Sequence, residues 1–228
     1  MPSTGRWRFA RLRGLLQPPN SIPLNQWTTD QGRRLSGRIV NIGCGTDDRL
    51  FGRCVVRVDA FAPKPTVRAN LEHPLPFANE VFDGAVCTEV LEHVADARAL
   101  LEEVCRMLKP GAPLVVTIPF VFQYHPDPGD YRRLTPVGLG EELGRAGFDV
   151  QFLGGIGGRC MAVWLMIESL HPLLKATMRL LLLPFRPLVL FRQPRHGAWS
   201  TWALHAVAVA TKRADGACAP ASRGRAES

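Results

Sequence analysis

Residues 38–45 read RIVNIGCG, an apolar run that ends directly in a Gly-x-Gly turn. The run has the length and composition of a buried parallel strand. Because glycine lacks a Cβ atom, Gly43 and Gly45 allow the backbone to turn sharply and to come within contact distance of a ligand. Plain turns also use this pattern, so the turn alone gives only a hypothesis of a binding site.

After this turn, apolar runs of strand length alternate with amphipathic segments of helix length. Residues 96–108 place their apolar side chains at helical spacing, and residues 135–146 begin with a Thr-Pro cap and stop at a glycine. The further expected strands are 54–58, 82–87, 113–118, 148–153 and 204–211. This alternation predicts an α/β fold with a doubly wound sheet, in which ligands bind beyond the carboxyl ends of the strands.

Asp59 ends the second expected strand, sixteen residues after Gly43. An acidic side chain at this place can accept hydrogen bonds from two ribose hydroxyls. A solvated aspartate at a strand end is the simpler interpretation of this residue alone. Together, the glycine turn and the acid indicate a ligand that contains adenosine.

The ligand could be a dinucleotide or S-adenosylmethionine. A dinucleotide site needs a third glycine and a helix N-terminus that receives a pyrophosphate. Here the chain instead reads Thr46-Asp47-Asp48. Two carboxylates would repel a pyrophosphate but not a sulfonium cation, so the local charge favours S-adenosylmethionine.

Four motifs follow one another: IVNIGCG at 39–45, LPF at 75–77 with FD at 82–83, EVLEHV at 89–94 and LKPG at 108–111. In this order they make the chain resemble the class I S-adenosylmethionine-dependent methyltransferases of the broad type 11 group, over residues 38–153 and the closing strand. The resemblance implies a Rossmann-like α/β fold. Its doubly wound, seven-stranded, mostly parallel sheet has helices on both faces and an antiparallel last strand, here preceded by an apolar helical insertion.

The resemblance also implies S-adenosyl-L-methionine as the cofactor and assigns roles to matching positions. Gly43 and Gly45 would line the methionine portion, and Asp59 would hold the ribose hydroxyls. The other cofactor contacts expected on these first two strands and their turns are Asn41, Cys44 and Ala60.

Later residues complete the expected cofactor site. Asn70 and Leu71 stand where family members meet the adenine, and an Asn carbonyl can accept from its exocyclic amine. Thr88 and Glu89, just past the fourth strand of the chain, would face the reactive methyl group.

The chain departs from the family pattern at the first turn. Asn41 replaces the usual acid, the third glycine is absent, and only eight residues separate Gly45 from Cys54. The first helix is therefore expected to be little more than a turn. A catalytically inactive adenosyl-binding scaffold, acting through a basic arm and the apolar insertion, stays open as the alternative function.

Methyl transfer from a sulfonium is an in-line displacement, and it needs a base only for a hydroxyl or ammonium acceptor. The candidate catalytic residues are His93, and His125 and Tyr131 in the polar loop that follows residues 113–118, where Asp127 and Asp130 are further candidate bases. For His93 a packing role is the competing interpretation. Arg132 and Arg133 could bind an anionic acceptor or could simply be solvated.

The six cysteines form no C-x-x-C pair and no Cys/His cluster at zinc spacing, so no metal site is expected. No apolar stretch near the N-terminus is long enough for a secretory signal, and a cytoplasmic location is the expectation.

The net charge of +8 is unevenly distributed. Residues 1–38 carry +6 and 156–198 carry +5, whereas 39–155 carry −5. The expected organisation is a basic N-terminal arm (1–37), a methyltransferase domain (38–155 with 199–213), an apolar basic helical insertion (156–198) and a disordered tail (214–228). The excess of basic residues therefore lies in the two segments that could dock on a partner, and not in the expected catalytic domain.

The insertion contains two apolar segments, 161–170 and 173–183, that are expected to be helices. Neither reaches the roughly 18–20 apolar residues of a spanning helix. A lid, a dimer contact, helices packed on the domain and a peripheral contact with an anionic membrane at its inner face all remain as interpretations.

The expected function is methyl transfer to a small-molecule, sugar-linked or lipid-linked acceptor. The residues 124–143, which include HPDPGDYRRLTP, resemble a subset of the family associated with saccharide or cell-surface biosynthesis. Nucleic acid is not expected as a partner, because Thr88-Glu89-Val90-Leu91 suits neither base stacking nor base flipping. The pattern assigns no oligomeric state.

Overall fold

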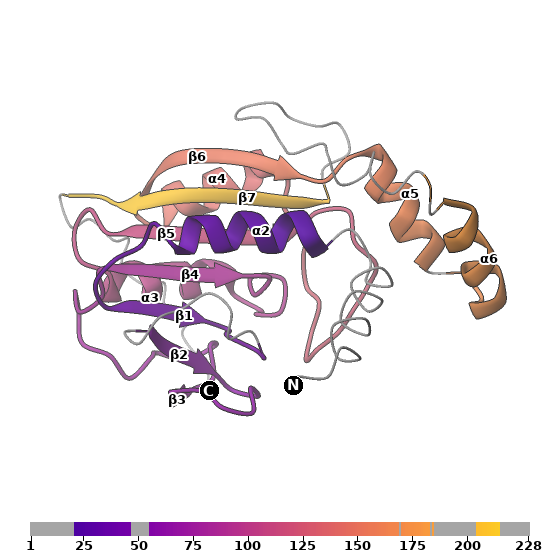
Figure 1. The fold of residues 1–228 in the computed structure, drawn as a ribbon. Coiled ribbons are helices and arrows are strands. Elements are labelled where there is room, and N and C mark those ends of the chain that lie inside the picture. The colour runs from indigo at the N-terminus through magenta and orange to yellow at the C-terminus, as the bar shows by residue number, and fades with distance from the viewer. Residues whose placement is uncertain (1–20, 47–54, 169, 183, 185–203, 215–228) are drawn as a thin grey trace, which may run out of the picture.

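The computed structural model describes residues 21–46, 55–168, 170–182, 184 and 204–214 (Figure 1). Several sequence expectations lie outside these residues. They are the short first helix after Thr46, the arginines of 186–195, the first twenty residues of the basic arm and the C-terminal tail from residue 215.

A seven-stranded sheet with the order β3-β2-β1-β4-β5-β7-β6 forms the centre of the molecule. Strand β7 pairs antiparallel with β5 and β6, whereas β1 to β5 pair parallel with one another. The α/β fold with its antiparallel last strand is therefore confirmed. The strands are β1 (Ile39–Ile42), β2 (Val55–Asp59), β3 (Val67–Arg68), β4 (Gly84–Thr88), β5 (Pro113–Pro119), β6 (Phe148–Ile156) and β7 (His205–Lys212).

Helices α3 (Ala97–Met107) and α4 (Pro136–Arg145) cover one face of the sheet (Figure 1). Both begin where the sequence predicts. Asp96 caps α3 by accepting from the backbone N–H of Ala99 at 3.0 Å, and Thr135 caps α4 in the same way.

The opposite face is covered by helix α2 (Ser21–Gly32), which the sequence analysis placed in the basic arm. Side chains alternate along a strand, so Ala85 packs into the core under α3 whereas Val86 points to the other side. There Val86 packs with Trp27 of α2. Both faces of a parallel sheet must be buried. The residues 21–32 serve this purpose as a helix that covers the second face.

Helices α5 (Arg159–Glu168) and α6 (Pro172–Leu182) follow β6 and extend beyond the carboxyl edge of the sheet (Figure 1). We call this pair the α5–α6 arm. Its base is anchored where Ala162 and Leu165 pack on Leu204 and Phe122. Among the described residues, no helix has the length and apolarity needed to span a membrane.

Candidate active site

The glycine turn after β1 takes a conformation that favours glycine. Gly43 and Gly45 have φ values of 65° and 50°. A Cβ atom on Gly43 would lie 2.3 Å from Cγ2 of Val90, whereas one on Gly45 would meet no atom within 4 Å. Gly43 is thus required for packing, and Gly45 leaves free space above the backbone.

Asp59, at the end of β2, holds this turn in place. Its Oδ2 accepts from the backbone N–H of Gly45 at 2.8 Å, and its Oδ1 accepts from those of Phe61 and Ala62 at 2.7 and 2.8 Å. A carboxylate has about four acceptor positions, so about one remains for a ligand. The structure therefore adds a structural task to the ligand-binding one expected for Asp59.

A cavity of about 470 Å³ lies at this end of the sheet. Its size is within the range of about 300–1,000 Å³ that is usual for small-molecule sites. The expected site residues that line it are Gly43, Gly45, Asp59, Ala60, Asn70, Leu71, Glu89, His93 and Tyr131. One cavity therefore brings together the glycine turn, the acid of β2 and part of the polar loop.

Four of the expected residues do not line the cavity: Asn41, Cys44, Thr88 and His125. Asn41 and Cys44 are buried, because β1 is the covered centre of the sheet and the turn folds the thiol inward. Thr88 is paired with Thr117 of β5. His125 lies behind His93, with ring centroids 5.0 Å apart.

Glu89 follows β4 in a strained backbone conformation, with a φ of 55°. Its Oε1 accepts from the Thr117 hydroxyl at 2.8 Å, and its Oε2 lies 3.0 Å from Nδ1 of the buried His205. The carboxylate thus connects β4 with β5 and β7. Such strain is typical of functional sites, where surrounding contacts hold it.

His93 and His125 present their Nε2 atoms to the same carboxylate. Nδ1 of His93 lies 2.5 Å from the carbonyl of Gly129, and Nδ1 of His125 lies 3.1 Å from the carbonyl of Gln123. A carbonyl can only accept, so Nδ1 is the donor in both rings, and Nε2 is the nitrogen that faces the carboxylate. These Nε2 atoms lie 3.6 and 4.0 Å from Oε1 of Glu92.

Glu92 itself is fully buried, at 0% exposure. Among the described residues, neither of its carboxylate oxygens has a hydrogen-bond partner. Burial raises the pKa of this carboxyl to about 8. A buried polar group without a partner is costly, so it needs an explanation.

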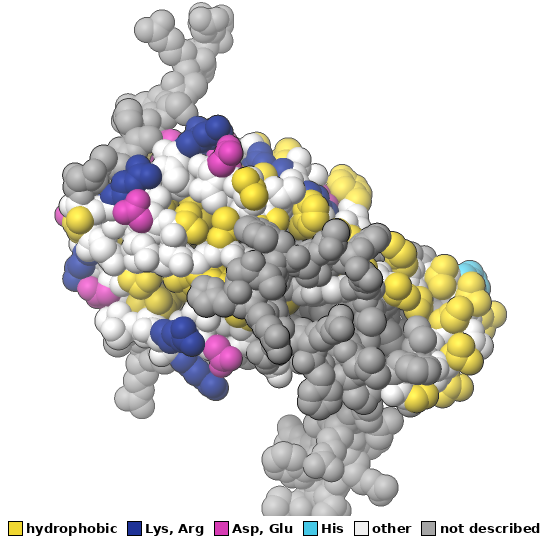
Figure 2. Space-filling view, turned by 90° about the horizontal axis from the view of Figure 1, so that it is seen from above, with side chains coloured by type: hydrophobic (Ala, Val, Ile, Leu, Met, Phe, Trp, Pro, Cys, Tyr) yellow, Lys and Arg dark blue, Asp and Glu magenta, His cyan; other side chains and the backbone are white. Residues whose placement is uncertain are grey.

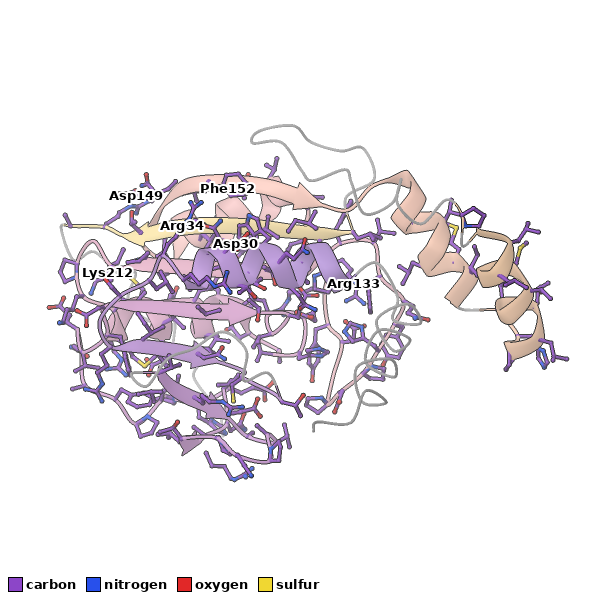
Figure 3. All side chains as sticks on the ribbon, in the orientation of Figure 1. Asp30, Arg34, Arg133, Asp149, Phe152 and Lys212 are labelled. Atoms are coloured by element: carbon purple, nitrogen blue, oxygen red, sulfur yellow. The ribbon has the colours of Figure 1, made fainter. Side chains whose placement is uncertain are left out.

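The loop after β5 is held against the turn that carries Glu92. The backbone N–H of Tyr131 donates to the carbonyl of Glu92 at 2.7 Å, and Arg132 donates to the carbonyls of Leu91 and Val94. Arg133, labelled in Figure 3 at the carboxyl edge, donates to both oxygens of Asp130 and lowers the pKa of that carboxyl well below its usual range. Both arginines thus fix the loop and are not simply solvated.

The sequence analysis did not select several residues of the site. Glu92 was noted only within the EVLEHV motif, although its position beside a histidine was a usable signal. The remaining cavity-lining residues that it did not assign are Thr46, Phe61, Ala62, Pro63, Glu72, Val90, Val94 and Pro128, whereas the candidate base Asp127 does line the cavity.

Residues 53–116 match a family described as a methyltransferase domain. Over this segment the chain resembles a methyltransferase domain, and it shares the α/β fold of a solved methyltransferase. The matched segment contains Asp59, Asn70, Glu89 and His93, four of the residues around the cavity.

Curated relatives of this methyltransferase domain are named O-methyltransferases. The O-methyltransferase rstn1 of Aspergillus nomiae NRRL is 29% identical over 133 residues, which cover 47% of this chain and 59% of that protein. An O-methyltransferase of Pyrenophora dematioidea is 41% identical over 112 residues, which cover 40% and 42%. The chain therefore spans about half the length of these relatives.

Solved structures share the fold. A possible histamine N-methyltransferase of Thermotoga maritima superposes with a TM-score of 0.57 at 18% identity, covering 91% of this chain and 97% of that one. The [4+2]-cyclase SpnF gives a TM-score of 0.51 at 16% identity, covering 81% and 79%. Because one of these proteins is a cyclase, the fold alone does not define the reaction.

Proposed function

We propose that the protein transfers a methyl group from S-adenosyl-L-methionine to a hydroxyl group of a small-molecule acceptor. The observation that carries the proposal is one cavity whose wall joins the glycine turn and Asp59 to His93 and Tyr131. The names of the curated relatives support a hydroxyl as the acceptor group.

The residues present fit the cofactor. Gly45 has open space where a Cβ would stand, and Asp59 keeps an acceptor position at the cavity. In this proposal the turn lies against the methionine portion, Asp59 holds the ribose, and Asn70 and Leu71 border the adenine. When bound, the cofactor supplies an electrophilic methyl group on a sulfonium.

The protein's own part in the reaction is to position the acceptor, exclude water and dispose of one proton. We assign the removal of this proton to the part of the wall formed by His93 and Tyr131. Tyr131 is 58% exposed, so it lies where an acceptor can reach the cavity. His125 does not line the cavity, and it contributes through its contact with the ring of His93.

A sugar-linked or lipid-linked acceptor remains part of the proposal, with the α5–α6 arm contacting an anionic membrane surface. Leu173, Leu180 and Leu181 of α6 are each about 70% exposed or more. Figure 2 shows hydrophobic side chains gathered at the end of the molecule where this arm lies. Exposed apolar patches of this kind are typical of interaction sites.

Calorimetry with S-adenosylhomocysteine tests the cofactor site. We expect Asp59→Ala to weaken binding about tenfold or more, because a charge-assisted hydrogen bond contributes about 1.5–3 kcal/mol. Asp83→Asn is the matched control, since Asp83 also accepts from a backbone N–H but does not line the cavity. Because both oxygens of Asp59 also accept from backbone N–H groups, circular dichroism and thermal melting of Asp59→Ala test whether the loss reflects misfolding.

Transfer itself is tested with methyl-labelled cofactor and a panel of hydroxyl, amine and carboxyl acceptors. Incorporation of the labelled methyl group into an ether product supports the proposal. Tight cofactor binding without transfer to any acceptor favours the inactive scaffold, and absence of binding overturns both.

Membrane contact is tested by sedimentation with anionic and neutral vesicles. We expect the protein to sediment with anionic vesicles, and the triple change of Leu173, Leu180 and Leu181 to Ser to lower the bound fraction at least by about half. Equal sedimentation of the wild type and the triple variant with anionic vesicles would exclude this role of the arm.

A further inference from the structure

We propose that Glu92, His93 and His125 bind a divalent transition-metal cation, with Zn²⁺ as the expected ion. Two imidazoles and one carboxylate are a donor set that such cations use, with a coordination position left for a substrate or water. The sequence analysis expected no metal site, because it searched for cysteine pairs and closely spaced histidines.

The three donor atoms already lie close together. Nε2 of His93 and Nε2 of His125 are 3.6 and 4.0 Å from Oε1 of Glu92, and all three atoms lie within 4.8 Å of one another. An ion with bonds of about 2.1 Å in tetrahedral geometry needs donor atoms about 3.4 Å apart. Small rotations of the three side chains are sufficient to bring their donor atoms to this separation.

The partners of the two rings orient them as metal ligands. Metal-binding histidines generally donate their second N–H to a carbonyl or a carboxylate, which fixes the tautomer. Here Nδ1 of His93 meets the Gly129 carbonyl, and Nδ1 of His125 meets the Gln123 carbonyl and lies 3.4 Å from Asp130. Both Nε2 lone pairs are therefore directed to the carboxylate of Glu92.

Glu92 provides the independent evidence for a ligand. It is 0% exposed, and neither oxygen has a hydrogen-bond partner among the described residues. The two Nε2 atoms, at 3.6 and 4.0 Å from Oε1, are too far away to form hydrogen bonds with it. A divalent cation would supply both the missing charge and the missing contacts.

The position of this site suggests what the cation does, and this step rests on the proposed function. His93 lines the cavity whereas Glu92 and His125 do not, so a cation on its Nε2 would lie behind the His93 ring and fix its orientation toward the acceptor. With the cation bound, Nε2 of His93 is occupied, so the proton of the acceptor hydroxyl leaves to solvent and not to this ring. The oxygen then bonds to the methyl carbon while the carbon–sulfur bond breaks and its electron pair stays on sulfur.

Metal binding is tested on the full chain without cofactor or acceptor. After treatment with a chelator and its removal, calorimetry with Zn²⁺ should show one strong site. We expect Glu92→Gln and His125→Gln each to weaken it about 100-fold, and Asp130→Asn to weaken it about 10-fold or more. His171→Ala is the control, because His171 is exposed in the α5–α6 arm and should leave the affinity unchanged.

Co²⁺ provides a second measurement that distinguishes this site from cysteine ligands. Ligation by imidazole and carboxylate gives weak visible bands without the intense near-ultraviolet band of thiolates. Strong Zn²⁺ binding that persists in the folded Glu92→Gln/His125→Gln double variant would overturn the proposal, as would the absence of binding to the wild type. Metal binding without methyl transfer would overturn only the proposed function.

Discussion

Lys212 and Glu92 are two buried ionisable residues at opposite edges of one sheet, and their surroundings differ. The ammonium of Lys212 donates to the carbonyl of Leu108 at 2.9 Å and to Glu80 at 3.1 Å. Figure 3 labels Lys212 at the amino edge, away from Arg133 at the carboxyl edge. Glu92 has no hydrogen-bond partner for its carboxylate among the described residues.

The difference separates a structural charge from a functional one. Burial of a charge stabilises a fold only where contacts compensate its desolvation. Lys212 meets that condition and joins the end of β7 to the turn before β5. Glu92 does not meet it among the described residues, and this is the observation behind the proposed cation site.

The largest effect is expected from Lys212→Met, which removes the contacts and keeps the length of the side chain. The carbonyl of Leu108 would lose a charged donor in a buried place. We expect the free energy of unfolding to fall by about 2 kcal/mol. Urea denaturation followed by circular dichroism measures it, and cofactor affinity should stay unchanged.

Glu80→Gln is the control for this change. The side chain of Glu80 is 48% exposed, whereas the ammonium of Lys212 is buried and keeps its hydrogen bond to the carbonyl of Leu108 in this variant. We therefore expect a smaller loss than for Lys212→Met, of about 1 kcal/mol. A loss as large as that of Lys212→Met would show that the ion pair, and not the Leu108 contact, satisfies the lysine.

A smaller effect of opposite sign is expected from Glu92→Met in a chelator. Removing an uncompensated buried carboxylate should raise the free energy of unfolding by about 1–2 kcal/mol. Differential scanning calorimetry of both proteins measures this gain. If the variant were less stable without metal, Glu92 would have a compensating partner, and the contrast with Lys212 would fail.

Local patterns were sufficient to predict most of the sheet. Parallel strands are buried on both faces, so runs such as residues 113–118 are continuously apolar, and the structure places β5 at Pro113–Pro119. The caps at Asp96 and Thr135 are also local signals. Strand β3 has two residues and depends on its pairing with β2, so no periodicity shows it.

In the candidate site, too, some residues could be predicted from local patterns and others could not. The glycine turn and Asp59 belong to short patterns around two strands, and both line the cavity. The approach of His125 to Glu92 depends on the loop after β5, which Arg132 and Arg133 hold in place. Contacts between residues so far apart in sequence have no local signal, and for that reason the cluster was not predicted.

Helix α2 precedes the first strand in sequence but covers the last strands in space. Leu24 packs with Ile156 and Val207, and the ring of Trp27 lies 6.0 Å from that of Phe152. Shortening the chain through Gly32 would therefore uncover an apolar sheet face near its other end and favour aggregation. A version that begins at Ser21 keeps α2 whole, and the difference in tryptophan fluorescence between it and its Trp27→Phe variant would report the melting of α2 with β6 and β7.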